Sequence, residues 1–235
     1  MARIVLYQFT LSPYCVKVRK ILEYKRLPYT TLEVNPFTRR GVHRLSGQRR
    51  VPVMVEEEAD GRPRTVVADS TAIALHLDAR HPDPPVYPHD PEERSRVLSL
   101  EDWSDETFAG DLIPFKILTG DNARRMVAQS VRYYPRTLPY RVLPPFGPVV
   151  LRRLASRRRR GRSPERLRAD YEADLAHLEE LARAGRFLAG GERPTVFDFA
   201  VWGLLRTMHG MQGEELLARH VSLAKWYERV ETIEA

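Results

Sequence analysis

The sequence predicts two domains, an α/β domain followed by an all-helical domain. Two observations lead to this prediction. Between residues 3 and 81, short β-prone runs alternate with segments of helical periodicity, which is typical of an α/β unit. After a proline-rich stretch at residues 81–88, the remaining segments read as helical. The chain of 235 residues is long enough to give two small domains a buried core each.

The first domain is expected to follow the order β-α-β-(α)-β-β-α. Apolar, β-branched runs predict strands at residues 4–9, 29–34, 51–55 and 65–68. Helical spacing predicts a helix from Pro13 to about Leu27, and Asp69-Ser70 is a typical start for another. Residues 35–50 are loop-rich and basic, so the helix in brackets would be short.

Four prolines within residues 81–88 mark the boundary between the domains. Proline fits neither a helix interior nor a central strand, so this segment is expected to be a linker. We therefore predict one domain at residues 1–81 and another at residues 91–235, joined by a linker at residues 82–90.

The second domain is expected to consist of helices alone. One long helix or two should cover residues 92–119, with a break near Gly110 or Pro114. Residues 133–149 contain five prolines and give no clear prediction. Further helices are expected at residues 166–183, 195–209 and 220–232.

Composition narrows the class of protein. Apolar residues make up 43% and charged residues 29%, as in an ordinary globular protein. No apolar run reaches the roughly 18 residues that cross a bilayer, and the N-terminal run is too short for a signal peptide. Cys15 is the single cysteine, so an internal disulfide is excluded. An unpaired thiol suits a reducing compartment, and we expect a cytoplasmic protein.

Positive charge is concentrated in one stretch of the chain. The formal net charge is +7, and residues 149–168 contain nine arginines against one acid, Glu165. Residues 152–168 contain no aromatic side chain, so specific nucleic-acid binding is not expected. We expect these arginines to lie on a solvated surface. The apolar stretch at residues 142–151 leaves a peripheral membrane contact open.

Ser12-Pro13-Tyr14-Cys15 is the first candidate site motif, at the junction of the first strand and the first helix. Ser12 is a good N-cap and Pro13 a good first helical residue, so a plain capped helix is one interpretation. The other interpretation is functional, because a helix N-terminus concentrates unpaired N–H groups and positive potential that stabilise a thiolate.

Two later motifs could complete a site. Pro52 is unusual at the start of a strand, and a cis bond after Val51 would present the Val51 backbone to an extended peptide. A trans proline on an edge strand is the alternative. Ser70 heads a helix that can receive a carboxylate, and Asp69 beside it can accept a hydrogen bond from an ammonium group. An ordinary helix cap is the alternative there.

In this order and spacing, the three motifs resemble the glutathione-binding layout of the glutathione transferase superfamily. The first motif also looks like the Cys-Pro-Tyr-Cys motif of glutaredoxin. The run from Phe187 to Ala200 resembles the superfamily's N-capping motif, in which Thr195 caps a helix and Asp198 reaches back to the cap's N–H group. The resemblance covers most of the chain and is weakest over residues 119–165. It implies a thioredoxin-like domain followed by a helical domain.

One branch of the superfamily resembles this chain more closely, the membrane-associated prostaglandin E synthase of the second type. Leu27-Pro28-Tyr29 and the tail ending in Trp226-Tyr227-Glu228-Arg229-Val230-Glu231 are among the similar stretches. That family has a Cys-Pro-Phe-Cys motif, binds glutathione and has been associated with haem. Here Ser12 replaces the first cysteine, and Phe9 replaces the tyrosine expected three residues earlier.

The resemblance implies a set of glutathione-binding residues in the first domain. The Val51 backbone would pair with the cysteinyl part of glutathione, and Pro52 would be cis. Asp69 and Ser70 would hold the γ-glutamyl end. Arg50 is a candidate for the glycine carboxylate.

The resemblance also implies where the chemistry lies. Ser12 would lie near the glutathione sulfur and donate a hydrogen bond to its thiolate, with Cys15 as the second candidate. The expected activity is glutathione transfer to a small hydrophobic electrophile, by a homodimer. The alternatives are a non-enzymatic binding protein and a thiol transferase or prostaglandin-E-synthase-like isomerase. No metal site is expected. We interpret Met208, His209 and Met211 as packing residues, with axial ligation of haem as the alternative that the sequence itself does not support.

Overall fold

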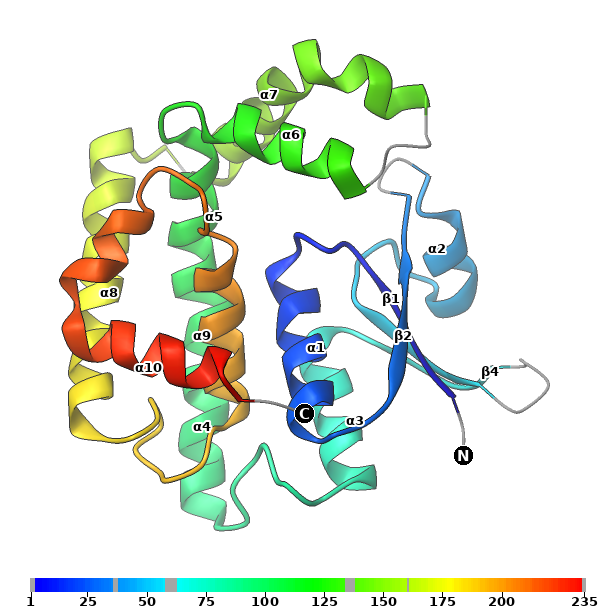
Figure 1. Cartoon of the computed structure of the whole chain (residues 1–235), viewed down its shortest axis with the longest axis vertical. Helices are drawn as coiled ribbons and strands as arrows, with labels where there is room; N and C mark the ends of the chain where they lie inside the picture. The colour runs from blue at the N-terminus through cyan, green and yellow to red at the C-terminus, as the bar shows by residue number, and fades with distance from the viewer. Residues whose placement is uncertain (1–2, 36–37, 58–62, 134–137, 160, 234–235) are drawn as a thin grey trace. The chain divides into compact units, whose positions relative to one another are not determined.

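The computed structural model describes residues 3–35, 38–57, 63–133, 138–159 and 161–233 (Figure 1). The chain forms two compact units. The first unit comprises residues 1–98, 194–207 and 230–235, and the second comprises residues 99–193 and 208–229. The domain boundaries that the sequence predicts, around residues 81 and 91, stay a prediction.

The first unit contains a mixed sheet of strands in the order β2-β1-β3-β4. Strand β1 pairs in parallel with β2 and antiparallel with β3, and β3 pairs antiparallel with β4. The α/β fold class and the element order expected from the sequence are confirmed. The strands are β1 (Arg3–Gln8), β2 (Tyr29–Glu33), β3 (Val53–Glu57) and β4 (Pro63–Ala68), and the helices between and after them are α1 (Pro13–Tyr24), α2 (Arg40–Ser46) and α3 (Ser70–Arg80).

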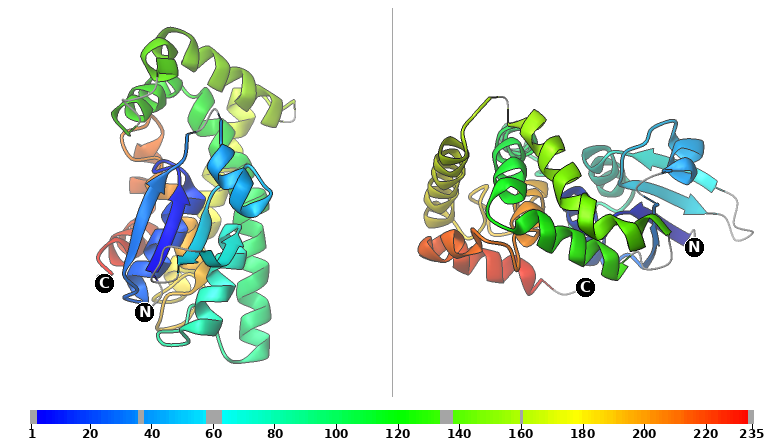
Figure 2. Two further views of the ribbon diagram at one scale, coloured as in Figure 1. Left: turned by 90° about the vertical axis from the view of Figure 1, so that its right-hand side faces the viewer. Right: turned by 90° about the horizontal axis from the view of Figure 1, so that it is seen from above.

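Helices cover both faces of this sheet. Figures 1 and 2 show α2 on one face and α1 with α3 on the other. Successive strand residues point to opposite faces, so one strand can serve both layers. On the α2 side, Val53 and Val55 pack with Val42 of α2. Leu6 and Met54 are direct neighbours across β1 and β3 and are fully buried.

Helix α9 (Val196–Arg206) also belongs to the first unit and packs against α1. The approach is close at Gly203, where an added Cβ would lie 2.8 Å from the carbonyl oxygen of Pro13. At the start of α9, Asp198 accepts hydrogen bonds from the Thr195 backbone N–H (2.8 Å) and hydroxyl (3.0 Å). The Thr195 side chain in turn accepts from the Asp198 backbone N–H, so the predicted reciprocal cap by Thr195 and Asp198 is confirmed.

The rest of the described chain is helical. Helix α4 (Pro91–Trp103) continues through a π-helical turn at Ser104–Phe108 into α5 (Ala109–Leu118). The expected break near Gly110 or Pro114 is wrong, because both lie inside α5 and the irregularity falls one turn earlier. The remaining elements are α6 (Asn122–Tyr133), α7 (Leu138–Arg158), α8 (Pro164–Ala184), a 3-10 helix (Glu214–Arg219) and α10 (Val221–Glu231).

Helix α7 runs through the proline-rich segment for which the sequence gives no clear prediction. Its inner side packs against α5 and α6, where Ala155 is buried with Ile117 and Ala123. Tertiary burial of this side stabilises a helix that local propensity does not favour. Among the described residues, no helix is both long and apolar enough to cross a membrane.

Stacked aromatic rings form part of the second unit's core. Phe115 of α5 lies over Tyr171 of α8, with ring centroids 4.7 Å apart, and Phe108 stacks on the same tyrosine at 6.3 Å. Gly213 lies close to this cluster, and a Cβ there would come within 2.7 Å of the Phe115 ring. Such rings bury a large apolar area, which fixes α5 against α8.

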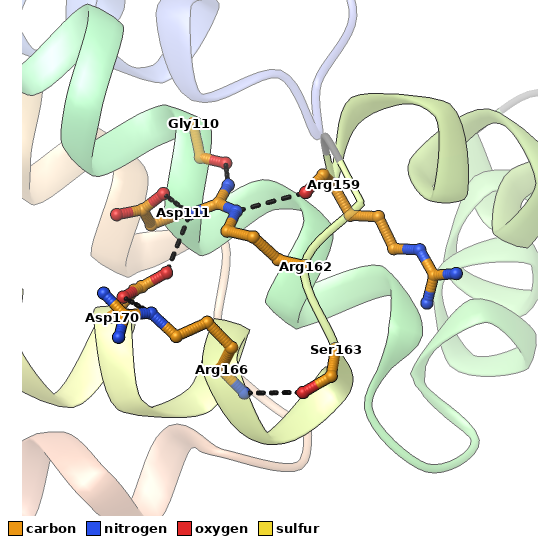
Figure 3. A network of polar contacts seen from close by, with 7 residues as sticks. All are labelled: Gly110, Asp111, Arg159, Arg162, Ser163, Arg166 and Asp170. Carbon is orange, nitrogen blue, oxygen red and sulfur yellow. Dashed lines mark hydrogen bonds and ion pairs between the residues drawn. The ribbon is translucent and has the colours of Figure 1, made fainter.

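Arg162 corrects the expectation that the whole arginine-rich stretch is solvated (Figure 3). Its guanidinium donates to Asp111 of α5, to Asp170 of α8 at 3.0 Å, and to the carbonyl oxygen of Gly110 at 3.1 Å. These bonds tie the start of α8 to α5, because a guanidinium offers five donors in a fixed plane. Among the described arginines of the stretch, Arg152, Arg153, Arg157, Arg158, Arg166 and Arg168 are exposed as expected, and Arg160 lies outside the described residues.

Candidate functional site

Sheet pairing brings the three motifs of the first unit to one end of the sheet. Tyr7 of β1 pairs with Val53 of β3, so the turn that follows β1 lies beside the segment that precedes β3. Val53 in turn pairs with Ala68 of β4. The residues just before β3 and just after β4 are therefore neighbours too. The topology thus gathers residues 9–15, 51–52 and 69–70, which are far apart in the sequence.

Ser12 begins α1 in the extended backbone conformation of an N-cap residue, but its side chain makes no capping hydrogen bond. Its backbone N–H donates to the carbonyl oxygen of Phe9 at 2.9 Å, which closes a tight turn after β1. Its hydroxyl hydrogen-bonds the sulfur of Cys15 and thereby lowers the pKa of that thiol. The Ser12 hydroxyl thus does not serve the first-turn N–H groups of α1.

A polar network that sequence reasoning missed holds the turn before Ser12. Glu33, at the end of β2, accepts hydrogen bonds from the Thr10 backbone N–H (3.1 Å) and hydroxyl and from the Gln8 side chain (2.6 Å). Arg19 of α1 donates to the Thr10 carbonyl oxygen at 3.2 Å and to Gln8. The parallel pairing of β1 with β2 brings Glu33 to this position, and local sequence holds no signal for such a contact.

Cys15 is completely buried, one helical turn further along α1. Burial raises the pKa of the Cys15 thiol to about 11, and hydrogen bonds with the Phe9 backbone and the Ser12 hydroxyl offset this only in part. Desolvation of the charged sulfur therefore opposes the stabilisation that the helix N-terminus would give a Cys15 thiolate.

The peptide bond between Val51 and Pro52 is cis. Pro52 is buried and its carbonyl oxygen accepts a hydrogen bond from the Asp69 N–H at 3.3 Å, which links the second motif to the third. The ladder of β3 begins at Val53, so Val51 lies outside the strand pairing of the described sheet. Arg50 precedes it with an exposed side chain.

Asp69 and Ser70 begin α3. The Asp69 Oδ1 atom accepts hydrogen bonds from the Thr71 N–H (2.9 Å) and the Ala72 N–H (3.3 Å), and the Asp69 Oδ2 atom takes neither. Ser70 is buried, whereas Asp69 is exposed. Asp69 also has a φ of +89°, a conformation that costs a non-glycine residue about 1–3 kcal/mol and is frequent at functional sites.

Electrostatics at this end of the sheet favour an anion. Helices α1 and α3 both begin here, and each directs the positive end of its dipole toward the site. The buried ammonium of Lys17 in α1 lies 3.4 Å from the Thr71 hydroxyl in α3 and links the two helices. The arrangement is suited to hold a carboxylate and to stabilise a thiolate.

The residues considered as haem ligands, Met208, His209 and Met211, have other contacts in the structure. Met208 and Met211 are buried in the second unit. The Met208 methyl group packs near Gly213, where an added Cβ would lie 3.3 Å from it. The His209 ring is 2.9 Å from the Glu214 carboxylate. These three residues therefore serve packing and a local ion pair. No group of His, Cys, Asp and Glu side chains among the described residues is arranged to hold a metal ion.

Both parts of the chain match families of known proteins. Residues 6–85 match the glutathione S-transferase N-terminal domain, and residues 156–229 match the glutathione S-transferase C-terminal domain. Among curated proteins, prostaglandin E synthase 2 of Mus musculus is 25% identical over 271 aligned residues, which cover 97% of this chain and 70% of the mouse protein.

Solved structures show the same relationship. A glutathione S-transferase from Rhodospirillum rubrum is 26% identical with a TM-score of 0.69, and the match covers 97% of this chain and 88% of that one. FzlA from C. crescentus has a TM-score of 0.69 at 21% identity, and the match covers 98% of this chain and 88% of FzlA. A Methylobacterium radiotolerans glutathione S-transferase, in complex with glutathione sulfonate, has a TM-score of 0.65 at 24% identity, with 98% and 91% covered.

The fold and the two domain matches define a thioredoxin-like domain followed by a helical domain. The chain belongs to the glutathione S-transferase superfamily.

Proposed function

We propose that this protein is a glutathione transferase, which activates the thiol of bound glutathione for attack on a small hydrophobic electrophile. The observation that carries the proposal is the state of Ser12. Its hydroxyl stands at the N-terminus of α1, and it does not cap that helix. A hydroxyl in this position can donate a hydrogen bond to a thiolate that also benefits from the helix field.

Glutathione would bind first through its γ-glutamyl end. Its α-carboxylate would take the N–H and hydroxyl groups of Ser70 at the start of α3. Its ammonium would bind Asp69, whose Oδ2 atom takes neither of the cap bonds. The strained backbone of Asp69 supports this role, because such conformations persist where a site needs them.

The cysteinyl part would pair with the backbone of Val51. This residue precedes the ladder of β3, so its N–H and C=O groups are suited to receive an extended peptide in the manner of an added strand. The glycine carboxylate would then approach the exposed side chain of Arg50. Together these contacts would direct the glutathione sulfur toward Ser12.

In the reaction the bound thiol gives its proton to water, and the Ser12 hydroxyl stabilises the thiolate that remains. The sulfur lone pair forms a C–S bond with the electrophilic carbon. The displaced electron pair leaves with the halide of an aryl halide, stays on the oxygen of an opened epoxide, or moves to the enolate oxygen of an enone. Without glutathione, the Ser12 hydroxyl acts as a donor toward the Cys15 sulfur and lowers the pKa of that thiol. A neutral thiol is a weak acceptor, so an arriving thiolate would take over this donor.

Thiol transfer through Cys15 is less well supported. The sulfur is buried, and burial raises its pKa to about 11, so little thiolate exists at neutral pH. Cys15 is also the single cysteine of the chain, which excludes a dithiol cycle. A non-enzymatic binding protein would keep the glutathione contacts but show no conjugation.

The test measures binding and catalysis separately. Isothermal titration calorimetry with glutathione reports the binding step. The ultraviolet absorbance of the glutathione thiolate, followed against pH, reports whether the bound thiol has a lowered pKa. Conjugation assays with an aryl halide, an epoxide and an enone report the chemical step, and reduction of a mixed disulfide reports thiol transfer.

We expect binding, a lowered thiol pKa and conjugation of at least one electrophile. Binding with a lowered pKa and no conjugation across the panel would favour the non-enzymatic alternative, and efficient disulfide reduction would favour thiol transfer. Absence of glutathione binding would overturn the proposal. We also propose a homodimer, which light scattering during size-exclusion chromatography tests.

A further inference from the structure

One side of helix α7, called the bare side below, exposes apolar side chains that no other part of the described chain covers. Four of its apolar side chains are strongly exposed: Phe146 (70%), Val149 (66%), Val150 (51%) and Leu154 (51%). Their spacing of three and four residues places them on one side of the helix. The opposite side is packed, since Ala155 is 1% exposed and Leu151 contacts the cluster around Ile117. Contiguous exposed apolar groups of this kind mark an interaction surface.

Positive charge accompanies these residues along the same helix. Arg153 and Arg157 follow Val150 at helical spacing on the bare side, and Arg158 flanks them; all three are exposed. Among the described residues, none of the three has an ion-pair partner. The sequence between Asp121 and Glu165 contains twelve arginines and no acidic residue, so any carboxylate that pairs with one of them comes from outside this stretch, as Asp111 and Asp170 do for Arg162.

The combination selects among possible partners. A nucleic acid would pair with the arginines but would leave the valines and Phe146 in contact with water. A second copy of α7 would cover the apolar groups but would bring two acid-free arginine clusters together. A membrane with anionic lipids satisfies both, because acyl chains receive the apolar side chains and lipid phosphates receive the guanidinium groups.

We propose that the bare side of α7 binds the surface of an anionic membrane, with the helix axis parallel to the membrane plane. Phe146, Val149 and Val150 enter the boundary between headgroups and acyl chains. Arg153 and Arg157 lie next to them, and their long side chains reach outward to the phosphates while the aliphatic parts stay on apolar surface. The contact is peripheral and weakens as salt screens the arginines.

Vesicle binding of the full chain tests the proposal with matched controls. Sedimentation uses vesicles of phosphatidylcholine alone or mixed with phosphatidylglycerol. Val150→Ser and Arg157→Glu change the bare side. Val221→Ser and Arg219→Glu make the same changes at an exposed valine and arginine elsewhere in the chain. All four positions are exposed, and thermal melting checks that each variant is folded.

We expect the protein to bind the mixed vesicles that contain phosphatidylglycerol and not the vesicles of phosphatidylcholine alone. Arg157→Glu should weaken it about tenfold or more and Val150→Ser about threefold, whereas both controls stay near wild type. Absence of binding to the anionic vesicles would overturn the proposal, as would equal losses in the controls. Binding that is insensitive to Val150→Ser, with tighter binding to duplex DNA, would assign the surface to nucleic acid. A dimer that Val150→Ser dissociates, without vesicle binding, would assign it to a second copy.

A fluorescent probe gives an independent measurement of depth. In a Cys15→Ala background, Val150→Cys and Val221→Cys each offer one thiol for a polarity-sensitive label. We expect the emission of the label at position 150 to shift to the blue on anionic vesicles, and the emission at position 221 to stay constant. A label at position 150 that remains fully aqueous on bound protein would overturn insertion of this side.

Discussion

Two helices of this chain begin with the same dipeptide, Ser-Pro, and their serines act differently. At α8, the Ser163 hydroxyl accepts a hydrogen bond from the Arg166 N–H at 3.2 Å and caps the helix. At α1, the Ser12 hydroxyl makes no cap and bonds the Cys15 sulfur instead. The first arrangement caps its helix, and the second is the one on which the proposed thiolate stabilisation depends.

The third residue after each serine explains part of the difference. At α8 this residue is Arg166, whose side chain turns to Asp170 at 2.8 Å and leaves its N–H to the serine (Figure 3). At α1 it is Cys15, whose thiol is buried and has its pKa lowered by the Ser12 hydroxyl. A helix start that satisfies its own N–H groups is a structural device, whereas one that does not can receive a ligand.

The largest effect should appear in catalysis. Ser12→Ala is expected to lose about tenfold to a hundredfold in kcat/KM for conjugation, roughly 1.4–2.7 kcal/mol, because the thiolate loses a directed donor. Ser163→Ala should stay near wild type in the same assay. Steady-state kinetics with glutathione and one reactive electrophile measure both. Equal activities of Ser12→Ala and wild type would show that the Ser12 hydroxyl does not contribute to conjugation.

The capping box of α9 extends the comparison to a buried helix start. Asp198→Ala should lower the free energy of unfolding by about 1–3 kcal/mol, because the buried N–H and hydroxyl of Thr195 lose their acceptor. Glutathione affinity of the folded variant should not change directly. Urea denaturation and calorimetry measure the two quantities. A melting temperature equal to wild type would show that this cap is unimportant.

Asp69 combines both behaviours, since it caps α3 and is expected to bind an ammonium group. Asp69→Asn retains an oxygen for the Thr71 and Ala72 N–H groups but removes the charge. It should therefore lose about 1–2 kcal/mol of glutathione affinity and little stability, whereas Asp69→Ala should lose both. Titration calorimetry and thermal melting separate these outcomes. Unchanged affinity of Asp69→Asn would argue against the ammonium contact.

A smaller effect should appear in the stability of the two Ser-Pro starts. Ser163→Ala is expected to lower the free energy of unfolding by about 1 kcal/mol, the typical contribution of an N-cap. Ser12→Ala should change it by only a few tenths, since its hydroxyl does not cap. Urea melts of both variants test this. Equal destabilisation by the two substitutions would contradict the structural contrast.

The smallest effect on conjugation is expected at Cys15. Cys15→Ala should keep kcat/KM within about threefold, because the buried thiol stays protonated. Burial raises its pKa to about 11, so the native state holds a proton that the unfolded chain releases at lower pH. This group therefore destabilises the fold as pH rises from about 9 to 11. Cys15→Ala should flatten that part of a stability-pH profile, and an inactive Cys15→Ala would instead favour thiol transfer.

Local pattern was enough to predict most elements of the first unit. The β-prone runs, the Ser-Pro and Asp-Ser helix starts and the Thr195–Asp198 box each depend on residues within one turn or one strand. The same locality explains the failures. Glu33 reaches Thr10 only because β2 pairs with β1, and Arg162 reaches Asp111 only because α8 packs on α5. Neither contact has a signature in neighbouring residues.

The sequence by itself determined the fold class, the helix starts and the residue types that make a glutathione site plausible, because propensity, capping and proline chemistry act over a few residues. Tertiary structure alone decided how those residues are used. Desolvation, which depends on every atom packed around a group, keeps the Cys15 thiol neutral. Sheet pairing sets Val51 and Asp69 beside the turn that carries Ser12. Burial of the inner side of α7 keeps a proline-rich segment helical and leaves its other side exposed.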